Sequence, residues 1–250
     1  MISVTPLSGK GSTVVASHPI VERALQQGHT LLTEIESKQV LHDLGIATTQ
    51  GQLATSEDEA VRLAVAIGFP VVLKIASPDI THKSDVGGVQ LNLHSAADVR
   101  YAYRAILQST AVHAPDARVE GVAVQAMAKP GVEVIIGMSQ DATFGPVLMF
   151  GLGGVLVEVL QDVAFRIVPL SQRDAAEMIR DLKGLPLLQG YRSTPAVDLD
   201  ALERMLLTLS EFVAQTPAIQ EIDLNPVYAY PEGALAVDAR IILAAPAASA

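Results

Sequence analysis

The stretch Ser56–Ile75, SEDEAVRLAVAIGFPVVLKI, contains one complete helix-to-strand unit and sets the pattern for the rest of the chain. Ser56 with Glu59 three residues later is typical of a helix start, because the two side chains can satisfy backbone N–H groups that the first turn leaves free. Gly68 is typical of a helix end, and the apolar run Val71–Ile75 predicts a buried strand. The stretch therefore predicts a helix packed against the strand that follows it.

Helix and strand signals alternate on both sides of this unit. Thr33 with Glu36 predicts an earlier helix start, and Gly45 predicts the end of that helix. Further strands are expected at 86–93, 118–127, 132–139, 146–150, 163–168, 219–228 and 234–243, and further helices at 96–109, 172–182 and 199–215. Because tight turns as well as helices join neighbouring strands, we expect an α+β fold with two lobes around a shared cleft, rather than a doubly wound parallel sheet.

The same pattern predicts where the lobes begin and end. Residues 1–33 are weakly patterned and are interpreted as a leader. We expect an N-terminal lobe at 34–118 and a C-terminal lobe at 119–243. The Ala-rich end, 244–250, is predicted to be a disordered tail.

Composition narrows the class of protein. The 250 residues are 50% apolar, which is enough for a substantial core, and the formal net charge is −10 without a cluster of basic residues. This charge argues against a nucleic-acid partner. The chain has no cysteine, so a disulfide framework, a thiolate metal site and a cysteine nucleophile are excluded. With no signal-peptide pattern and no apolar run long enough for a bilayer, we expect a cytoplasmic protein and no membrane partner.

Lys74 and the loop after it are the first candidates for chemistry. Lys74 interrupts an apolar strand, where an ammonium group needs an anionic partner unless it reaches water at a sheet edge. The loop Ser77–Gly88 contains His82 and Lys83. An imidazole can act as a nucleophile toward phosphorus, and the adjacent Lys83 ammonium together with free backbone donors near Gly87–Gly88 could hold the resulting anion. The alternative is an ordinary surface turn.

A second glycine cluster, Gly151–Gly154, follows the apolar strand 147–150. Such turns let backbone donors approach a phosphate, or let two backbone segments pack closely. The spacing matches neither a dinucleotide fingerprint nor a Walker loop, so the pattern is weak by itself. Glu133, at the start of a strand, is either an acceptor for ribose hydroxyls or an ordinary edge carboxylate.

Oxygen-bearing side chains gather near the C-terminus. Strand alternation places Glu221, Asp223 and Asn225 on one face, and an antiparallel return strand could set Asp238 beside Asn225. A magnesium site needs one or two such protein oxygens together with nucleotide phosphates. A hairpin stabilised by polar pairs is the alternative interpretation.

Taken together and in order, eight segments resemble the ATP-grasp domain of the nucleoside-diphosphate-forming acyl-CoA ligases, as in the β subunit of ADP-forming acetyl-CoA synthetase. The succinyl-CoA synthetase β subunit is a related protein. The resemblance runs from about Glu34 to Leu243. Its segments are 72–74, 77–88, 131–133, 144–146, 151–154, 190–192, 223–226 and 237–240. One departure is Ser193-Thr194 after the Gly-Tyr-Arg triplet, where the family commonly has Gly, which leaves that loop in doubt.

The resemblance implies an ATP-grasp fold of two α+β lobes that clasp ATP or ADP, and it implies roles at matching positions. Lys74 looks like the lysine that holds the ATP phosphates, and Glu133 like the acidic residue near the ribose. Asn225 and Asp238 look like Mg²⁺ ligands, and His82 like the histidine that receives phosphate. The remaining positions are the adenine hinge and the glycines near the phosphate path, at Gln125, Ala126, Met127, Gly153 and Gly154.

The implied activity is that of a nucleotide-binding β subunit of an ADP-forming acyl-CoA ligase, which transfers phosphate between ATP and a histidine. In the family, acyl phosphate and thioester form on another region with a CoA-binding domain and its own phosphohistidine. Nothing in this chain resembles that domain, so we expect a CoA-binding α subunit as partner, in an α2β2 or larger assembly. A non-catalytic or regulatory ATP-grasp domain and another ATP-grasp carboxylate ligase are the alternatives. The acid is not indicated.

Overall fold

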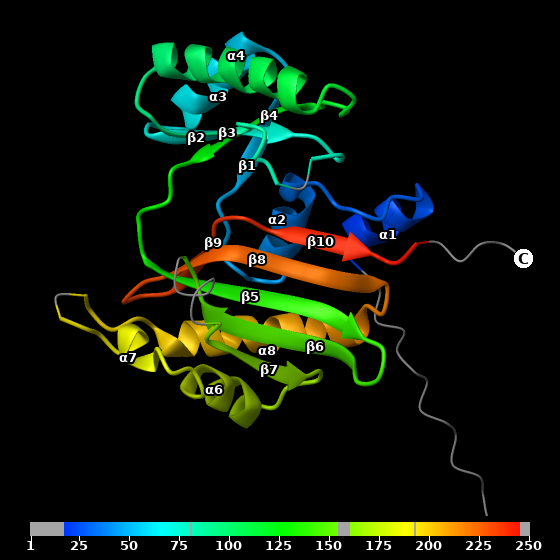
Figure 1. Ribbon diagram of the computed structural model, residues 1–250, viewed down its shortest axis with the longest axis vertical. Helices are drawn as coiled ribbons and strands as arrows, with labels where there is room; N and C mark the ends of the chain where they lie inside the picture. Colours follow the sequence, from blue (N-terminus) through cyan, green and yellow to red (C-terminus); the bar gives the residue numbers. More distant parts are fainter. Residues whose placement is uncertain (1–17, 81, 155–160, 193, 246–250) are drawn as a thin grey trace, which may run out of the picture.

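Two antiparallel sheets form the framework of the molecule, and the computed structural model describes residues 18–80, 82–154, 161–192 and 194–245. The small sheet has the order β1-β4-β2-β3, and helices α3 and α4 pack on it (Figure 1). Its core includes Leu73, Val124 and Ile106. The bounds of these elements are β1 Gly51–Ala54, α3 Glu57–Ile67, β2 Val71–Ala76, β3 Val89–Leu93, α4 Ala96–His113 and β4 Gly121–Ala126.

The large sheet has the order β10-β8-β5-β6-β7, with β9 paired to β8. Helices α6 and α8 pack against β6 and β7, and Ile136, Phe150 and Leu209 lie in the core between them. The bounds are β5 Val132–Asp141, β6 Gly145–Leu152, β7 Val163–Ile167, α6 Gln172–Arg180, α7 Leu185–Leu188, α8 Leu199–Gln215, β8 Ile219–Ala229, β9 Ala234–Ala236 and β10 Arg240–Leu243.

Two N-terminal helices, α1 (Pro19–Gln26) and α2 (Glu34–Asp43), add Val21 and Leu41 to the core of the large sheet. Helix α2 contacts both β1 and β10, so it lies between the two sheets (Figure 1). None of the helices in the described ranges is long and apolar enough to cross a membrane.

The helix starts predicted at Thr33 and Ser56 and the helix ends predicted at Gly45 and Gly68 are confirmed. Thr33 accepts from the N–H of Glu36, and the Glu36 carboxylate accepts from the N–H of Thr33, which is the reciprocal capping arrangement. At α3 the oxygen of Ser56 accepts from the N–H of Glu59 at 3.3 Å. Glu59 itself turns to Thr55 instead of Ser56, so this cap is only half of the expected pair.

Four expectations about boundaries differ from the structure. The predicted leader contains α1, whose Val21 is fully buried, so part of it belongs to the core. The lobe boundary near 118 lies one strand too early, because β4 pairs with β1 and β2 of the small sheet. The strand expected at 86–93 begins only at Val89, and the one expected at 234–243 is divided into β9 and β10 around Asp238. Residues 1–17 of the leader and 246–250 of the tail lie outside the described ranges.

Candidate functional site

Lys74 points from the small sheet toward the large sheet. Its neighbours Leu73 and Ile75 face the core under α3 and α4, and strand alternation therefore turns Lys74 to the opposite face. The Lys74 ammonium lies 2.7 Å from Glu34 Oε1 and 2.8 Å from Asp238 Oδ2. Only 5% of the residue is exposed, so the interpretation as an edge lysine that reaches water is wrong.

These contacts set the charge of Lys74. Burial by itself would lower the pKa of the ammonium, but Glu34 and Asp238 together hold the pKa of Lys74 above its ordinary value. The group therefore remains a cation in a dry environment. The ammonium also donates to the backbone carbonyl of Val237 at 3.4 Å. A buried cation held mainly by carboxylates that can exchange partners suits the binding of an anionic ligand.

Glu34 is the carboxylate that the sequence did not indicate. Its Oε1 also accepts from Lys38 at 2.6 Å, and its Oε2 lies 2.9 Å from the Lys83 ammonium. Burial would raise the pKa of Glu34, but Lys74, Lys38 and Lys83 hold that pKa far below its usual range. We call Glu34, Lys38, Lys74, Lys83 and Asp238 the lysine–carboxylate cluster.

Lys38 anchors this cluster to the small sheet. It is 1% exposed, and its ammonium donates to Thr49 Oγ1 at 2.9 Å and to Gln125 Oε1 at 2.8 Å. Burial lowers the pKa of Lys38 to about 8, although Glu34 opposes the shift. The side-chain oxygen of Gln125 is therefore engaged by a lysine.

Asp238 lies between β9 and β10, opposite Asn225 of β8. The paired positions on either side, Val227 with Ala236 and Asp223 with Arg240, bring the two residues to the same level of the hairpin. Asn225 is exposed, and the Asp238 carboxylate is 31% exposed. A carboxylate and an amide oxygen at the same level of the hairpin fit the oxygen donors that magnesium prefers. The described residues contain no group of three or more His, Cys, Asp and Glu that could hold a metal by itself.

His82 is exposed on the loop between β2 and β3. The loop is closed by its own backbone, because Gly87 donates to Ser84 O at 3.0 Å and Gly88 donates to Lys83 O at 2.7 Å. The expectation of free donors at these two glycines is therefore wrong. Gly88 instead permits a close approach, since a Cβ there would lie 2.5 Å from Ile75 Cγ2.

Asp223 connects His82 electrostatically with the large sheet. Burial raises the pKa of Asp223, and Glu221 and Asp238 raise it further, whereas Arg240 and His82 act in the opposite direction. Arg240 lies 3.8 Å from Asp223 and forms a closer pair with Glu221. The charge of His82 thus bears on the carboxyl group of Asp223.

Glu133 packs against the second glycine cluster. Its carbonyl accepts from the N–H of Gly153 at 2.7 Å, and a Cβ at Gly153 would lie 2.9 Å from Glu133 Cβ. Gly154 has a φ of 66°, and a Cβ there would lie 3.0 Å from the Glu133 carboxylate. The glycines are therefore needed for close packing around Glu133, and residues 155–160 lie outside the described ranges.

The expected adenine hinge borders a cavity of about 670 Å³. Ala126 and Met127 line it, together with Ile67, Tyr230 and Leu235 among others. The N–H of Met127 donates to Pro70 O at 3.0 Å, so that donor already serves the small sheet. The apolar lining and the size suit a purine ring system.

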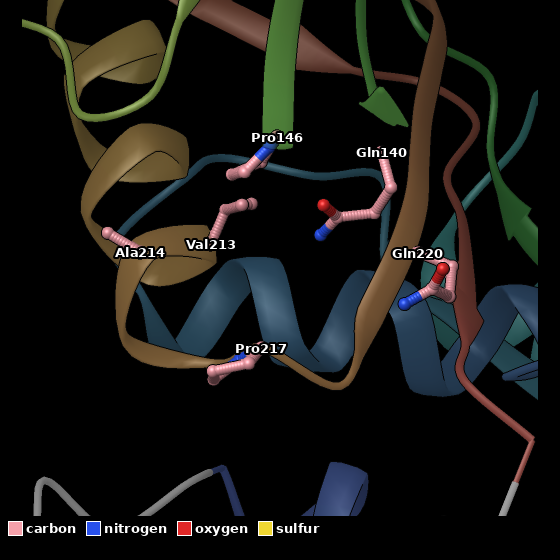
Figure 2. A pocket seen from close by; sticks show the side chains of 6 residues that line it. All are labelled: Gln140, Pro146, Val213, Ala214, Pro217 and Gln220. Carbon is pink, nitrogen blue, oxygen red and sulfur yellow. The ribbon is translucent and has the colours of Figure 1, made fainter. Parts of the chain in front are cut away.

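A second hollow, of about 330 Å³, lies at the C-terminal end of α8 (Figure 2). None of the residues expected to act on a nucleotide lines it. The lining residues are Gln140, Pro146, Val213, Ala214, Pro217 and Gln220.

Comparison with known proteins agrees with this arrangement. The family model described as an ATP-grasp domain matches residues 23–243. This chain belongs to the ATP-grasp family. The β subunit of ADP-forming acetate–CoA ligase I from Pyrococcus furiosus is 44% identical over 92% of this chain and 99% of its own length, so the chain belongs with the ADP-forming acid–CoA ligases of that family.

A longer relative and a solved structure extend this comparison. ADP-forming acetate–CoA ligase I of Archaeoglobus fulgidus is 44% identical over 90% of this chain, which covers only 32% of that protein. An acetyl-coenzyme A synthetase 1 from Ca. Korarchaeum cryptofilum, solved with coenzyme A and Ca-AMPCP, has a TM-score of 0.88 and 48% identity, over 90% of this ATP-grasp chain and 98% of that chain. A further structure of that synthetase contains Mg-AMPPCP and a phosphohistidine segment that points towards the nucleotide binding site, with a TM-score of 0.79.

The structure joins the expected residues into three groups, one of which is Glu133 with Gly153 and Gly154. Lys74 and Asp238 are in direct contact, with Asn225 opposite Asp238 and with His82 on the adjoining loop. The third group is the hinge cavity at Ala126 and Met127. Two members of the cluster, Glu34 and Lys38, had no role assigned from the sequence, whereas Lys83 was expected to help hold the anion formed at His82. The four-residue spacing of Glu34 and Lys38 is also typical of a solvent-exposed helix pair, so it could not indicate burial.

Proposed function

We propose that this chain is the nucleotide-binding β subunit of an ADP-forming acid–CoA ligase, and that it transfers phosphate between ATP and His82. The observation that carries the proposal is the position of Lys74. A buried ammonium meets the carboxylate of Asp238 at 2.8 Å, and the loop with His82 follows the strand of Lys74 directly. Cation, oxygen donors and nucleophile are thus collected where the two sheets meet.

ATP enters this arrangement as substrate. Its adenine fits the apolar cavity at Ala126 and Met127, and Glu133 supplies a carboxylate for the ribose hydroxyls. The phosphates then lie toward Lys74, whose ammonium exchanges a carboxylate partner for a phosphate oxygen. This exchange is favourable because the buried cation keeps an anion beside it throughout.

A magnesium ion would rest on Asp238 and Asn225, whose oxygens fit it by type and exposure. When bound, the ion would neutralise charge on the phosphates. Asp238 pairs with Lys74 at 2.8 Å, and the same carboxylate could hold either this protein cation or a metal cation.

The transfer to His82 needs positioning more than covalent help from other residues. The unprotonated nitrogen of the imidazole attacks the γ-phosphorus with its lone pair. The bond between that phosphorus and the β–γ bridging oxygen breaks, and ADP leaves with the electron pair. Lys74 stabilises the phosphate charge during this step, and the electrostatic interaction of Asp223 with His82 favours the imidazolium character that develops there.

A partner subunit completes the proposed reaction. This chain covers nearly the whole β subunit of the Pyrococcus relative but only 32% of the longer Archaeoglobus ligase. The remaining chemistry, which joins the acid to coenzyme A, therefore belongs to a CoA-binding α subunit with its own phosphohistidine. The exposed position of His82 suits a phosphate that is passed on to such a partner.

The test is labelling of the full-length chain with γ-labelled ATP, with and without its partner subunit. We expect label on His82 in the wild type, none in His82→Ala, and a loss of at least about 100-fold in the rate with Lys74→Ala, since this removes the main cationic contact. His94→Ala is the matched control, because His94 is another exposed histidine outside the site. Full labelling and ligase activity in both His82→Ala and Lys74→Ala would refute the proposal.

A further inference from the structure

Three lysines from three separate elements converge on the single carboxylate of Glu34. Lys38 comes from the same helix, Lys74 from β2 of the small sheet, and Lys83 from the loop that follows β2. The Glu34 side chain is only 8% exposed. Exposed ion pairs along the helix would be enough to stabilise helix α2. A single buried carboxylate paired with three cations therefore goes beyond what the helix itself requires.

The two oxygens of Glu34 serve different parts of the site. Oε1 accepts hydrogen bonds from Lys38 and Lys74, whereas Oε2 accepts none from the described residues and forms only an ion pair with Lys83, 2.9 Å away. Lys83 is the residue next to His82. The only other carboxylate near Lys83 in the described cluster, Asp238, is 3.9 Å away, so Lys83 depends mainly on Glu34. Glu34 thus connects the phosphate-binding lysine with the histidine loop.

Lys38 differs from the other two lysines because additional hydrogen bonds keep its ammonium in place. It is fixed by Thr49 and Gln125 as well as by Glu34, and it is nearly inaccessible. When Lys74 turns to a phosphate, Glu34 loses one cation but keeps Lys38 on the same oxygen. A buried carboxylate that loses every cation would be costly, so Lys38 keeps Glu34 in place during the exchange.

We propose that Glu34 is a positioning residue that connects Lys74 to the histidine loop through Lys83, with Lys38 as its permanent counterion. The proposal rests on the proposed phosphate transfer to His82. Glu34 contacts no reacting atom in it. It sets where the His82 loop lies relative to the phosphate that Lys74 holds, and a small displacement of a nucleophile is enough to slow such a step.

The experiment compares transfer rate with nucleotide affinity in Lys83→Met. Lys83 is partly exposed, so this variant should fold. We expect single-turnover labelling of His82 to slow by about tenfold, while the dissociation constant for Mg-ATP, measured by calorimetry, stays within about threefold of the wild type. A merely structural pair would not separate these two quantities.

A double-mutant cycle tests whether Lys83 acts through Glu34. Glu34→Gln should slow the labelling of His82 at least as much as Lys83→Met, and the two changes together should be no slower than Glu34→Gln alone. Rates that multiply in the double variant would overturn the proposal. A Lys83→Met chain that labels His82 at the wild-type rate would overturn it as well.

Glu34→Gln leaves three lysines with one carboxylate and can unfold the chain, so a charge-matched variant is needed. Glu34→Gln with Lys38→Met keeps the net charge of the cluster, and we expect a higher Tm than for Glu34→Gln with transfer still slow. Restored transfer would contradict a role for the carboxylate itself. Glu36→Gln is the matched control on the same helix, because it removes a capping carboxylate that touches none of the three lysines.

Failure of the proposed function gives a different result. A wild-type chain without label on His82 removes the proposed function and this inference together. A labelled wild type with unchanged labelling in Lys83→Met removes the inference alone.

Discussion

The small sheet and the large sheet contribute opposite charges to one site. The small sheet and its loop supply Lys74 and Lys83, whereas the large sheet supplies Asp238. Helix α2, between them, supplies both signs through Glu34 and Lys38. The small sheet could not keep Lys74 buried without the carboxylates of Glu34 and Asp238, because an unpaired buried ammonium is costly.

The charged groups of the two sheets meet in one site, but their apolar side chains form two separate cores. The core of the small sheet, with α3 and α4, is separate from the larger core that includes α1, α2, α6 and α8. The sheets are therefore packed separately by apolar contacts and joined in part by ionic ones. Such a junction can change its partners when a ligand arrives without disturbing either core.

The largest effect on stability is expected from substitutions in the two apolar cores. Phe150→Ala in the large core and Ile106→Ala in the small one each remove a fully buried side chain, and we expect losses of about 3–5 and 2–5 kcal/mol in the free energy of unfolding. The measurement is denaturant unfolding followed by circular dichroism. Since the cluster joins the halves, we expect one transition in the wild type. Two resolved transitions would show that the ionic junction does not couple the cores.

The next largest effect is expected from Asp238→Asn, because this change removes the carboxylate that the large sheet contributes. We expect the labelling of His82 from ATP to slow by about 100-fold, since Lys74 and the proposed magnesium site lose the same group. Titration of magnesium in single-turnover assays should show a higher requirement for the ion. Asp116→Asn, at an exposed turn, is the control. Unchanged transfer and magnesium dependence would remove Asp238 from the site.

The comparison of the sheets also shows what the sequence could predict. Helix caps at Thr33 and Ser56 and the strand Val71–Ile75 were predicted correctly, because the deciding interactions lie within a few residues. Helix α8 was predicted with the bounds that the structure shows, since its apolar face is long and regular. The contact of Lys74 with an acidic partner was also anticipated by its place in an apolar strand.

The remaining features depend on partners far away in the sequence. Strand β1 is short, and it is recognisable as a strand only because it pairs with β4, some 70 residues later. Helix α1 has only two buried residues, Val21 and Ala24, which a single sequence cannot distinguish from a loop. Glu34 meets Lys74 across 40 residues, and nothing local indicates that contact. The free donors expected at Gly87 and Gly88 were wrong because the loop closes on itself.

A smaller effect is expected from Gly88→Ala, which tests how firmly the small sheet fixes the histidine loop. A Cβ at this position would lie 2.5 Å from Ile75 Cγ2 and 2.8 Å from Lys83 O, so the loop must shift. We expect the labelling of His82 to slow by about tenfold, with less change in ATP affinity. Gly51→Ala is the matched control, because its Cβ would meet nothing closer than 3.8 Å. Equal rates in both variants would mean that the loop position does not limit transfer.

The smallest effect concerns Asp198, which belongs only to the large-sheet half and should leave the ionic junction intact. Its carboxylate caps α8 by accepting from Ala201 N–H at 2.9 Å and also accepts from Gly233 N–H at 3.1 Å. Asp198→Ala should lower the free energy of unfolding at pH 7 by about 1 kcal/mol, without slowing transfer to His82.

The pH dependence of this loss gives the sharper test. The backbone donors of Ala201 and Gly233 hold the pKa of Asp198 below its ordinary value, so near pH 4 the unfolded chain binds more protons there than the folded chain. The stabilisation is therefore present above about pH 4 and is lost as the pH falls through the lowered pKa of the folded state. We expect the difference between wild type and Asp198→Ala in urea unfolding to shrink toward pH 3. A difference that stays constant with pH would show that the cap acts through packing rather than through the charge of the carboxylate.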